Sequence, residues 1–271
     1  MAPLHQRDHA IERLNNLLDL DIDHVETLSF DFHQVLRYPR NILSFALAAE
    51  AGAGDYYEDV GNGAKLVFEP GFVYLLPVGS TVRFERSQRT RTVTLHFSLE
   101  LVRGIDLLSQ MDGCVRFYDP AAVERMRLCL EDPDKLRAAC GIRQEVLRIC
   151  HQFWPRQVPD YDAVAGETYA EVFRLIRRHG DAALGVGDLA ALMHQRQDVF
   201  SRSFKRAFGV PPGTVLRNAL LRRVSGLLLD RGRSVKDVAR ELRFSSEFYL
   251  SRFFKKCTGL SPRDYRSQHH G

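Results

Sequence analysis

A segment of this chain returns, in nearly the same form, 50 residues further on. Residues 201–212 read SRSFKRAFGVPP and residues 251–262 read SRFFKKCTGLSP. Serine, arginine, phenylalanine, lysine, glycine and the final proline recur in the same order. Internal repetition constrains architecture strongly, because each copy is expected to form the same local structure. Here each copy predicts a short amphipathic helix with basic residues on its outer face, ended by a glycine.

The positive charge of the chain gathers around this repeat. Residues 181–271 hold 17 Lys/Arg against 8 Asp/Glu, whereas residues 1–180 hold 21 against 26. A basic segment beside an acidic remainder is typical of a nucleic-acid-binding module joined to a second domain. At 271 residues the chain is long enough for two domains with separate cores. We therefore expect double-stranded DNA as the partner of the C-terminal third.

Cysteine usage and hydropathy indicate the compartment. The five cysteines are odd in number and none is spaced as Cys-x-x-Cys, which favours free thiols over a disulfide framework. No apolar stretch of signal-peptide length opens the sequence, and no apolar run approaches the ~18 residues of a membrane span. These features predict a cytoplasmic protein that does not bind membranes.

Two kinds of periodicity divide the chain. Within residues 25–100, short apolar or alternating runs separated by glycine and proline turns predict strands of a small antiparallel barrel. Between residues 119 and 179, apolar side chains recur at helical steps. The glycine-rich segment 180–187 is the candidate linker. We expect an α+β protein: a β-barrel domain, a helical segment and an all-helical domain with two helix-turn-helix units. Their predicted ranges are 1–115, 116–180 and 181–271.

The C-terminal pattern is a short helix, a tight turn and a basic helix, present twice. In a helix-turn-helix the second helix enters the major groove, and we call it the reading helix. Arg202 and Arg252 occupy the same early position in the two second helices, where a guanidinium can donate two hydrogen bonds to guanine. The connecting helix, residues 212–230, spans roughly 28 Å, close to the ~34 Å of one duplex turn. Successive major grooves are therefore within reach, although both arginines could instead be ordinary solvated residues.

Residues 185–266 resemble the DNA-binding domain of the arabinose-regulator (AraC/XylS) family of bacterial transcription regulators. The segments that carry the resemblance are Leu189-Ala190, Phe200-Ser201-Arg202, Phe204-Lys205, Gly209, Pro212, Val238-Ala239, Phe244-Ser245, Ser251-Arg252, Phe254-Lys255-Lys256, Gly259, Ser261-Pro262 and Tyr265-Arg266. The resemblance implies base reading by Asp198, Ser201, Arg202, Glu247, Phe248, Ser251 and Arg252. We expect phosphate contacts, which set affinity rather than sequence preference, from Arg196, Lys205, Arg206, Lys255 and Lys256.

The chain departs from the family pattern in four places. His194 and Arg243 stand at the two turn positions where the family usually has glycine, and a positive φ suits histidine better than arginine. Asp198 puts a carboxylate into the first reading helix, where it repels phosphate unless it accepts from cytosine. Leu220 replaces an arginine of the connecting helix. These departures leave open whether the first unit reads bases.

The N-terminal part resembles, more loosely, the cupin-like effector domain common in this family. The segments are Tyr38-Pro39, Glu69-Pro70-Gly71, Phe72 to Pro77 with Gly79, and Leu95-His96-Phe97. The resemblance implies a small-molecule effector, a sugar being one candidate class, and a homodimer formed through residues 116–180. RNA polymerase is a further candidate partner. Candidate effector contacts are Tyr38, Arg40, Tyr74 and His96, each of which could also be a plain barrel residue.

Two other functions remain open. The N-terminal part could serve only to dimerise a DNA-binding protein that needs no effector, which a thermal-shift screen against sugars would distinguish. It could also be a cupin-type enzyme, which a metal assay would reveal. The strand region has no His-x-His pair and no cluster of histidine and glutamate ligands. We therefore expect no metal, no cofactor and no catalytic residues.

Overall fold

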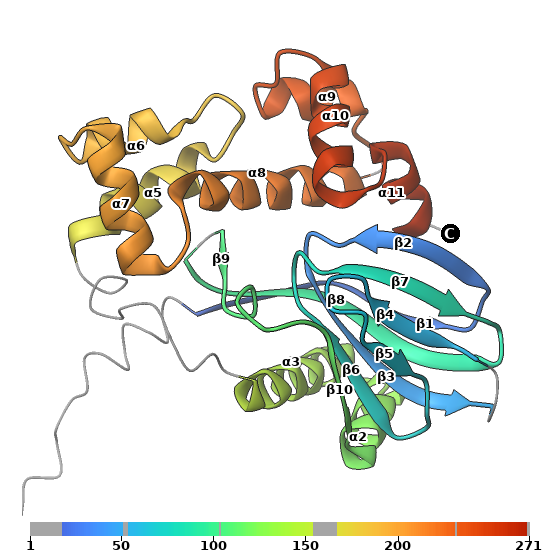
Figure 1. Ribbon diagram of the computed structural model, residues 1–271. Helices are drawn as coiled ribbons and strands as arrows, with labels where there is room; N and C mark the ends of the chain where they lie inside the picture. Colours follow the sequence, from blue (N-terminus) through green and yellow to red (C-terminus); the bar gives the residue numbers. More distant parts are fainter. Residues whose placement is uncertain (1–17, 51–53, 103, 154–166, 231, 270–271) are drawn as a thin grey trace, which may run out of the picture.

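The computed structural model describes residues 18–50, 54–102, 104–153, 167–230 and 232–269 (Figure 1). The strands are β1 (Asp19–Leu28), β2 (Phe32–Arg37), β3 (Asn41–Ala49), β4 (Tyr56–Asp59), β5 (Lys65–Val67), β6 (Phe72–Leu76), β7 (Thr81–Arg86), β8 (Thr90–Val102), β9 (Ile105–Asp106) and β10 (Val115–Tyr118). The helices are α2 (Pro120–Glu131), α3 (Lys135–Gln152), the 3-10 helix η1 (Glu167–Tyr169), α5 (Ala170–His179), α6 (Val186–Leu192), α7 (Gln197–Phe208), α8 (Pro212–Leu229), α9 (Val235–Glu241), α10 (Glu247–Thr258) and α11 (Pro262–His269).

The strands form two antiparallel sheets. The first has the order β1-β8-β3-β6-β10, with β9 pairing on β8, and the second has the order β2-β7-β4-β5. Helices α2 and α3 lie on the outer side of the first sheet, and α10 and α11 lie above β2 of the second (Figure 1). Helix α8 extends from α7 to α10, above β9. The predicted α+β class is confirmed: an antiparallel N-terminal part precedes an all-helical C-terminal part.

The first sheet has a core on both faces, because successive side chains of a strand point to opposite sides. On β3, Leu43 and Phe45 share a core with α2 and α3. Ile42 and Ala46 pack instead with side chains of the second sheet. Strand β8 alternates in the same way, with polar residues on the inner face. The buried polar residues of β8 are Thr90, Thr92, Thr94, His96, Ser98 and Glu100.

Hydrogen bonds satisfy polar side chains between the two sheets. The hydroxyl of Ser44 is 3.0 Å from that of Thr94 and 3.2 Å from that of Tyr57 on β4. The Tyr57 ring packs edge-on against Phe84, with 5.0 Å between ring centroids. The space between the sheets is therefore closely packed with aromatic rings and bonded hydroxyls.

Aspartates cap the two helices that cover the first sheet. The Asp119 side chain accepts from the backbone N–H of Ala122 at the start of α2, and Asp134 caps α3 in the same way. Such caps satisfy N–H groups that have no partner within the helix. The outer surface of this helix pair leaves Leu136 and Leu147 exposed, at 76% and 37% of their accessible area.

Helix α5 packs on the first helix-turn-helix unit. Tyr169 and Phe173 contact the rings of Phe204 and Phe208 on α7, with centroid distances from 5.0 to 5.9 Å. The sequence-based domain boundary falls between residues 180 and 181. It therefore separates α5 from the first helix-turn-helix unit, although α5 and that unit share a core. The three domain ranges themselves stay predictions.

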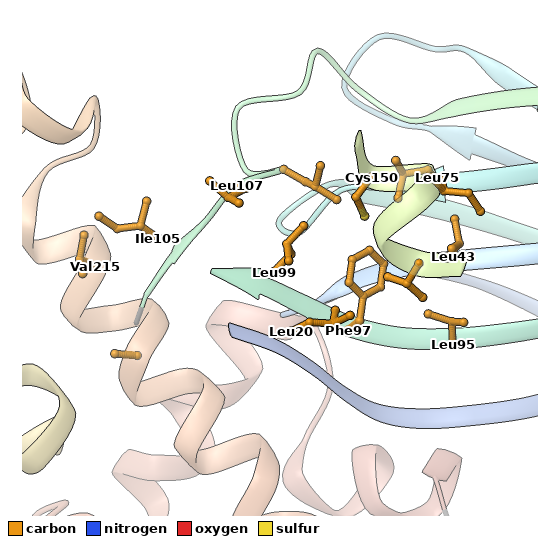
Figure 2. Close-up of a cluster of buried hydrophobic side chains, with 14 of the residues drawn as sticks. Leu20, Leu43, Leu75, Leu95, Phe97, Leu99, Ile105, Leu107, Cys150 and Val215 are labelled. Carbon is orange, nitrogen blue, oxygen red and sulfur yellow. The ribbon is translucent and has the colours of Figure 1, made fainter. Parts of the chain in front are cut away.

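The sheets and α8 are joined by apolar packing. A core cluster runs from the first sheet through Ile105 on β9 to Val215 on α8 (Figure 2). Close by, the side-chain amide of Asn218 donates to the carbonyl of Gly104 over 3.3 Å. The hairpin formed by β8 and β9 therefore lies directly against α8.

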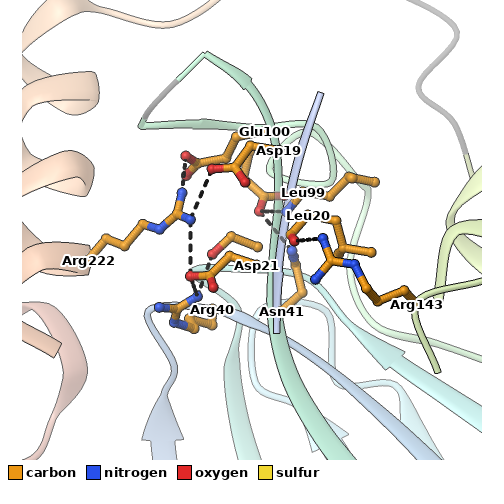
Figure 3. A network of polar contacts seen from close by, with 11 residues as sticks. Asp19, Leu20, Asp21, Arg40, Asn41, Leu99, Glu100, Arg143 and Arg222 are labelled. Atoms are coloured by element: carbon orange, nitrogen blue, oxygen red, sulfur yellow. Dashed lines mark hydrogen bonds and ion pairs between the residues drawn. The ribbon is translucent and has the colours of Figure 1, made fainter. Parts of the chain in front are cut away.

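Ion pairs make a second connection between the same parts (Figure 3). Arg222 on α8 binds the carboxylates of Glu100, Asp21 and Asp19, the last two at 3.0 and 3.3 Å. Only 12% of the Arg222 side chain is exposed. Arg40 donates to Asp21 over 3.0 Å and extends the network into the sheet. We call Arg222 with Asp19, Asp21 and Glu100 the α8 ion cluster.

No helix in the described ranges is both long and apolar enough to cross a membrane. Within these ranges, no three His, Cys, Asp or Glu side chains are grouped so as to hold a metal ion. The cysteines are free thiols: Cys114 and Cys150 are buried, Cys129 and Cys257 half-buried, and Cys140 exposed.

Candidate nucleic-acid interface

Two helix-turn-helix units lie at the two ends of α8 (Figure 1). The first consists of α6 and α7, the second of α9 and α10. In both units the turn contains a residue in the left-handed region, His194 with φ 50° and Arg243 with φ 57°. The expectation of a positive φ at these two positions is confirmed. Both reading helices end at left-handed glycines, Gly209 with φ 73° and Gly259 with φ 85°.

The reading helices bury matching faces. Phe200 and Phe204 of α7 are fully buried, as are Leu250 and Phe254 at the same positions of α10. The opposite face carries the candidate contacts. The structure leaves exposed or half-exposed every predicted DNA contact: Asp198, Ser201, Arg202, Glu247, Phe248, Ser251, Arg252, Arg196, Lys205, Arg206, Lys255 and Lys256. Their roles stay predictions.

The two arginines in matching positions have different surroundings. The Arg202 guanidinium lies 3.1 Å from Asp198 one turn earlier, and Arg196 lies 3.2 Å from the same carboxylate. In the second unit the place of Asp198 is taken by Phe248, whose side chain is 73% exposed. Arg252 has no ion pair with any residue of the described ranges. It is therefore free to contact another molecule.

The second unit is better capped than the first. The Ser234 hydroxyl accepts from the N–H of Asp237, and the Asp237 carboxylate accepts from the N–H of Ser234. Ser246 caps α10 through the N–H of Tyr249. Arg196, the N-cap residue of α7, makes no side-chain cap. Capping contributes about 1 kcal/mol per helix, so the second reading helix has the firmer start.

Leu220, which replaces the arginine of the family pattern, is 9% exposed. It belongs to the core cluster that contains Val224, Leu250 and Phe254. An arginine here would project a charge from the edge of that core. The leucine therefore adds packing to the second unit and removes a cation from α8.

The candidate effector residues are only partly brought together. The rings of Tyr38 and His96 lie 5.1 Å apart. Arg40 is instead held by Asp21 and by the Ser98 hydroxyl, which is 2.9 Å away. Tyr74 is fully buried, and its hydroxyl donates to the carbonyl of Val67 and accepts from the N–H of Glu69, both at 2.9 Å. Burial raises the pKa of Tyr74 to about 12.

A cavity of about 460 Å³ lies between the sheets and the second unit. Of the four candidate effector residues, it is lined by Tyr38 alone. We call it the interdomain cleft. Its lining residues include Arg37, Tyr38, Glu100, Asp106, Arg217, Leu221, Arg222, Tyr249, Arg252, Phe253 and Lys256. Sequence reasoning missed Arg37, Arg217, Tyr249 and Phe253, because nothing local to them signals that they meet.

Comparison with known proteins agrees with this geometry. Residues 189–268 match the family model of a helix-turn-helix domain. An uncharacterized HTH-type transcriptional regulator of Bacillus subtilis, YisR, is 26% identical over 96 residues, which are 35% of this chain and 33% of that protein. The putative HTH-type transcriptional regulator YkgA of Escherichia coli is 25% identical over 113 residues, 42% of this chain and 47% of that protein. The chain spans less than half the length of the curated relatives it matches.

Among proteins of known structure, similarity extends to both parts of the chain. ToxT from Vibrio cholerae superimposes with a TM-score of 0.60 over 94% of this chain and 99% of its own, at 11% identity. A structure of ToxT with bound unsaturated fatty acid also has a TM-score of 0.60, over 94% and 96% of the two chains, at 11% identity. At such identity the likeness shows the fold alone.

Proposed function

Because residues 189–268 form a helix-turn-helix domain of the AraC type, we propose that this protein is a DNA-binding regulator of transcription. One observation supports the proposal most: Arg202 and Arg252 occupy the same place on two exposed reading helices joined by a single 18-residue helix. A helix of that length spans roughly 27 Å, close to the distance between successive major grooves on one face of a duplex. In this proposal catalysis is not part of the function.

The test is selection of bound fragments from a random duplex library by the full-length protein, followed by salt titration of the best fragment. We expect paired half-sites. Replacing Arg252 by alanine should weaken binding about tenfold or more and relax the preference at one base pair, since a bidentate arginine–guanine contact is worth ~1–3 kcal/mol. Arg91→Ala, at an exposed arginine of β8, is the control and should change neither property.

The proposal fails if fragments are enriched in no common sequence and binding disappears at moderate salt for every variant. Such behaviour is that of a protein held only by phosphate charge. The selected sequence can then be located in genomic DNA, where the genes beside its natural sites would indicate which process is controlled.

The N-terminal part is proposed to bind a small molecule that alters the placement of the two units. Family resemblance suggests a sugar, whereas the related fold with a bound fatty acid suggests that carboxylic acids belong in the same screen. A thermal-shift screen of both classes on the full-length protein tests this. A ligand shifts an equilibrium only if it binds one state better than the other, so an effector must also change DNA affinity.

Dimerisation is proposed to occur through the outer surface of α2 and α3. Leu136 and Leu147 lie on the same side of α3, and Leu128 of α2 is 52% exposed. Two protomers would bring four reading helices to one operator, so modest contacts at each half-site would add to high specificity.

A further inference from the structure

The segment between α5 and α6 extends toward the second helix-turn-helix unit (Figure 1). The chain turns sharply at Gly180, where the N–H of Asp181 donates to the carbonyl of His179 over 2.6 Å. A Cβ at residue 180 would lie 2.6 Å from the carbonyl oxygen of Ile176, so the turn requires glycine. The turn directs the next two residues away from α5.

These two residues contact the second unit, although they precede the first unit in the sequence. The N–H of Ala182 donates over 2.9 Å to the carbonyl of Leu242, the residue that ends α9. The Ala182 side chain packs against the apolar cluster that contains Val238 of α9 and Leu250 of α10. The segment is therefore joined to the second unit by a backbone hydrogen bond and by apolar packing.

An ion pair adds to this connection. The Asp181 carboxylate, only 10% exposed, lies 3.7 Å from the guanidinium of Arg243 in the turn between α9 and α10. Its other oxygen accepts from the N–H of Ala183 over 2.9 Å, which fixes the orientation of the carboxylate. Arg243 has φ 57°, a conformation that favours glycine. The pair with Asp181 gives arginine a role at this turn that glycine lacks.

Helix α8 binds the same segment, because Arg223 donates to the carbonyl of Gly180 over 3.1 Å. Helix α5, which precedes the segment, packs on α7, and α6, which follows it, belongs to the first unit. We call residues 180–182 the brace. Elements of the first unit or packed on it flank the brace on both sides, and its own contacts are with α8 and the second unit.

The two units are thus joined twice, through α8 and through the brace. Domains joined at one place retain freedom to move relative to each other. A second connection, away from the first, removes much of that freedom. The brace therefore acts on the separation of the two reading helices and on their relative twist.

We propose that the brace holds the two helix-turn-helix units in one relative placement, so that the protein accepts a single spacing between the two half-sites of its operator. Asp181, Ala182 and Arg243 are then positioning residues that act through the units and not on the bases. The proposal rests on the proposed function, because spacing matters only if both units contact DNA. One inserted base pair moves a half-site by about 3.4 Å and rotates it by about 35°. Two units in fixed placement then lose one half-site.

The experiment uses the sequence obtained by fragment selection, at its selected spacing and with one base pair inserted or removed between the half-sites. Anisotropy titration of the full-length protein gives a Kd for each duplex. For the native chain we expect either change to raise the Kd about tenfold or more, since the base contacts of one unit are lost. The ratio of the two Kd values is the spacing penalty.

The first variant is Ala182→Pro, which removes the N–H that donates to Leu242. Residue 182 is the second position of a turn closed by the N–H of Leu184 and the carbonyl of Asp181 over 3.4 Å, and proline is favoured at that position. We expect the spacing penalty to fall to about threefold or less. Asp181→Asn keeps an oxygen for Ala183 and loses only the charge, so its penalty should fall less.

The matched control compares two glycine substitutions. Arg243→Gly and His194→Gly each relieve a positive φ in the turn of one unit. Arg243→Gly also removes the contact with Asp181, whereas His194 has no ion pair with any described residue. We therefore expect a lower spacing penalty for Arg243→Gly and the native penalty for His194→Gly. A variant that only destabilises the fold would weaken binding by the same factor at every spacing.

A native chain that binds all three spacings equally would overturn the role of the brace, as would an Ala182→Pro variant with the native penalty. Selection of a site with a single half-site would also overturn it, and the protein would remain a DNA-binding regulator. Binding without sequence preference at any spacing, by the native chain and every variant, would refute the proposed function instead.

Discussion

The guanidinium of Arg202 donates a hydrogen bond to the carboxylate of Asp198, with 3.1 Å between Nη2 and Oδ2. Both residues lie on the exposed face of α7, one turn apart. In the second unit Phe248 stands in place of the carboxylate, so Arg252 has no such neighbour on its own helix. Two reading helices with the same scaffold therefore differ in how readily their arginines reach a base.

Replacing Asp198 by asparagine should strengthen DNA binding. An exposed pair of this spacing is worth only ~0.3–0.5 kcal/mol, and the lost carboxylate also repels phosphates. We expect a gain of about two- to fivefold at low salt that shrinks as salt screens the charge. Anisotropy titrations at two salt concentrations measure it, with the exposed loop substitution Asp112→Asn as control. A loss of affinity would mean instead that Asp198 accepts from a cytosine.

Replacing His194 by glycine should stabilise the protein. The left-handed conformation costs a residue with a Cβ roughly 1–2 kcal/mol. Glycine avoids this cost, but its greater conformational entropy in the unfolded chain offsets part of the gain. We expect a net gain below about 1 kcal/mol, seen as a higher urea midpoint. His194 suits this test better than Arg243, which lies 3.7 Å from Asp181. Ala191→Gly, within α6, should lower the midpoint; a fall for both variants would contradict the reasoning.

The buried Asp106 should make stability depend on pH. Burial raises the pKa of its carboxyl to about 7, against backbone hydrogen bonds that lower it. The ordinary value is ~3.9, so the native state holds the proton more tightly than the unfolded chain. The contribution of Asp106 to the free energy of unfolding is therefore full at acidic pH, and it is lost as the pH rises through about 7.

Unfolding by urea between about pH 5 and about pH 8 tests this. Compared with Asp106→Asn, the native chain should lose stability as the pH rises, by at most ~1.4 kcal/mol per pH unit for one group. Asp112→Asn should not alter the slope. A stability difference between the native chain and Asp106→Asn that stays constant over this pH range would show that Asp106 is ionised throughout.

Leu136→Lys should disrupt the proposed dimer. Leu136 is 76% exposed on α3, so the change costs the isolated protomer little. In an interface it would place a charge against an apolar surface. Sedimentation velocity should show the native chain as a dimer and the variant as a monomer at equal concentration. Val60→Lys, at an exposed turn next to β4, should sediment like the native chain; a monomeric native chain would remove the proposal.

The sequence predicted what depends on short-range patterns. Glycine stops at Gly209 and Gly259, strand alternation, and positive φ at His194 and Arg243 all follow from a few neighbouring residues. It did not predict the pairing of Asp198 with Arg202, because a spacing of four allows a contact without requiring it.

Contacts between distant segments lay outside sequence reasoning altogether. The packing of Tyr169 on α7 and the approach of Arg37 to α10 depend on how whole elements are arranged, and no local signal specifies that. Tyr74 shows a different limit of sequence reasoning. Its position in a strand was predicted correctly, but its hydroxyl hydrogen-bonds to backbone groups of Val67 and Glu69. Residue type and strand position together do not tell a ligand contact from a structural bond.

Helix α8 is fastened to the sheets at two places, through Val215 and through Arg222, about two turns apart on one side. A helix held at one place can rotate about its own axis, whereas a helix held at two places cannot. Both helix-turn-helix units are attached to α8, so in the proposed function the N-terminal part sets their orientation relative to the duplex. A shift of β1 or of the β8–β9 hairpin would turn both units by the same angle, and a rotation too small to break any contact within either unit would still carry both out of their grooves.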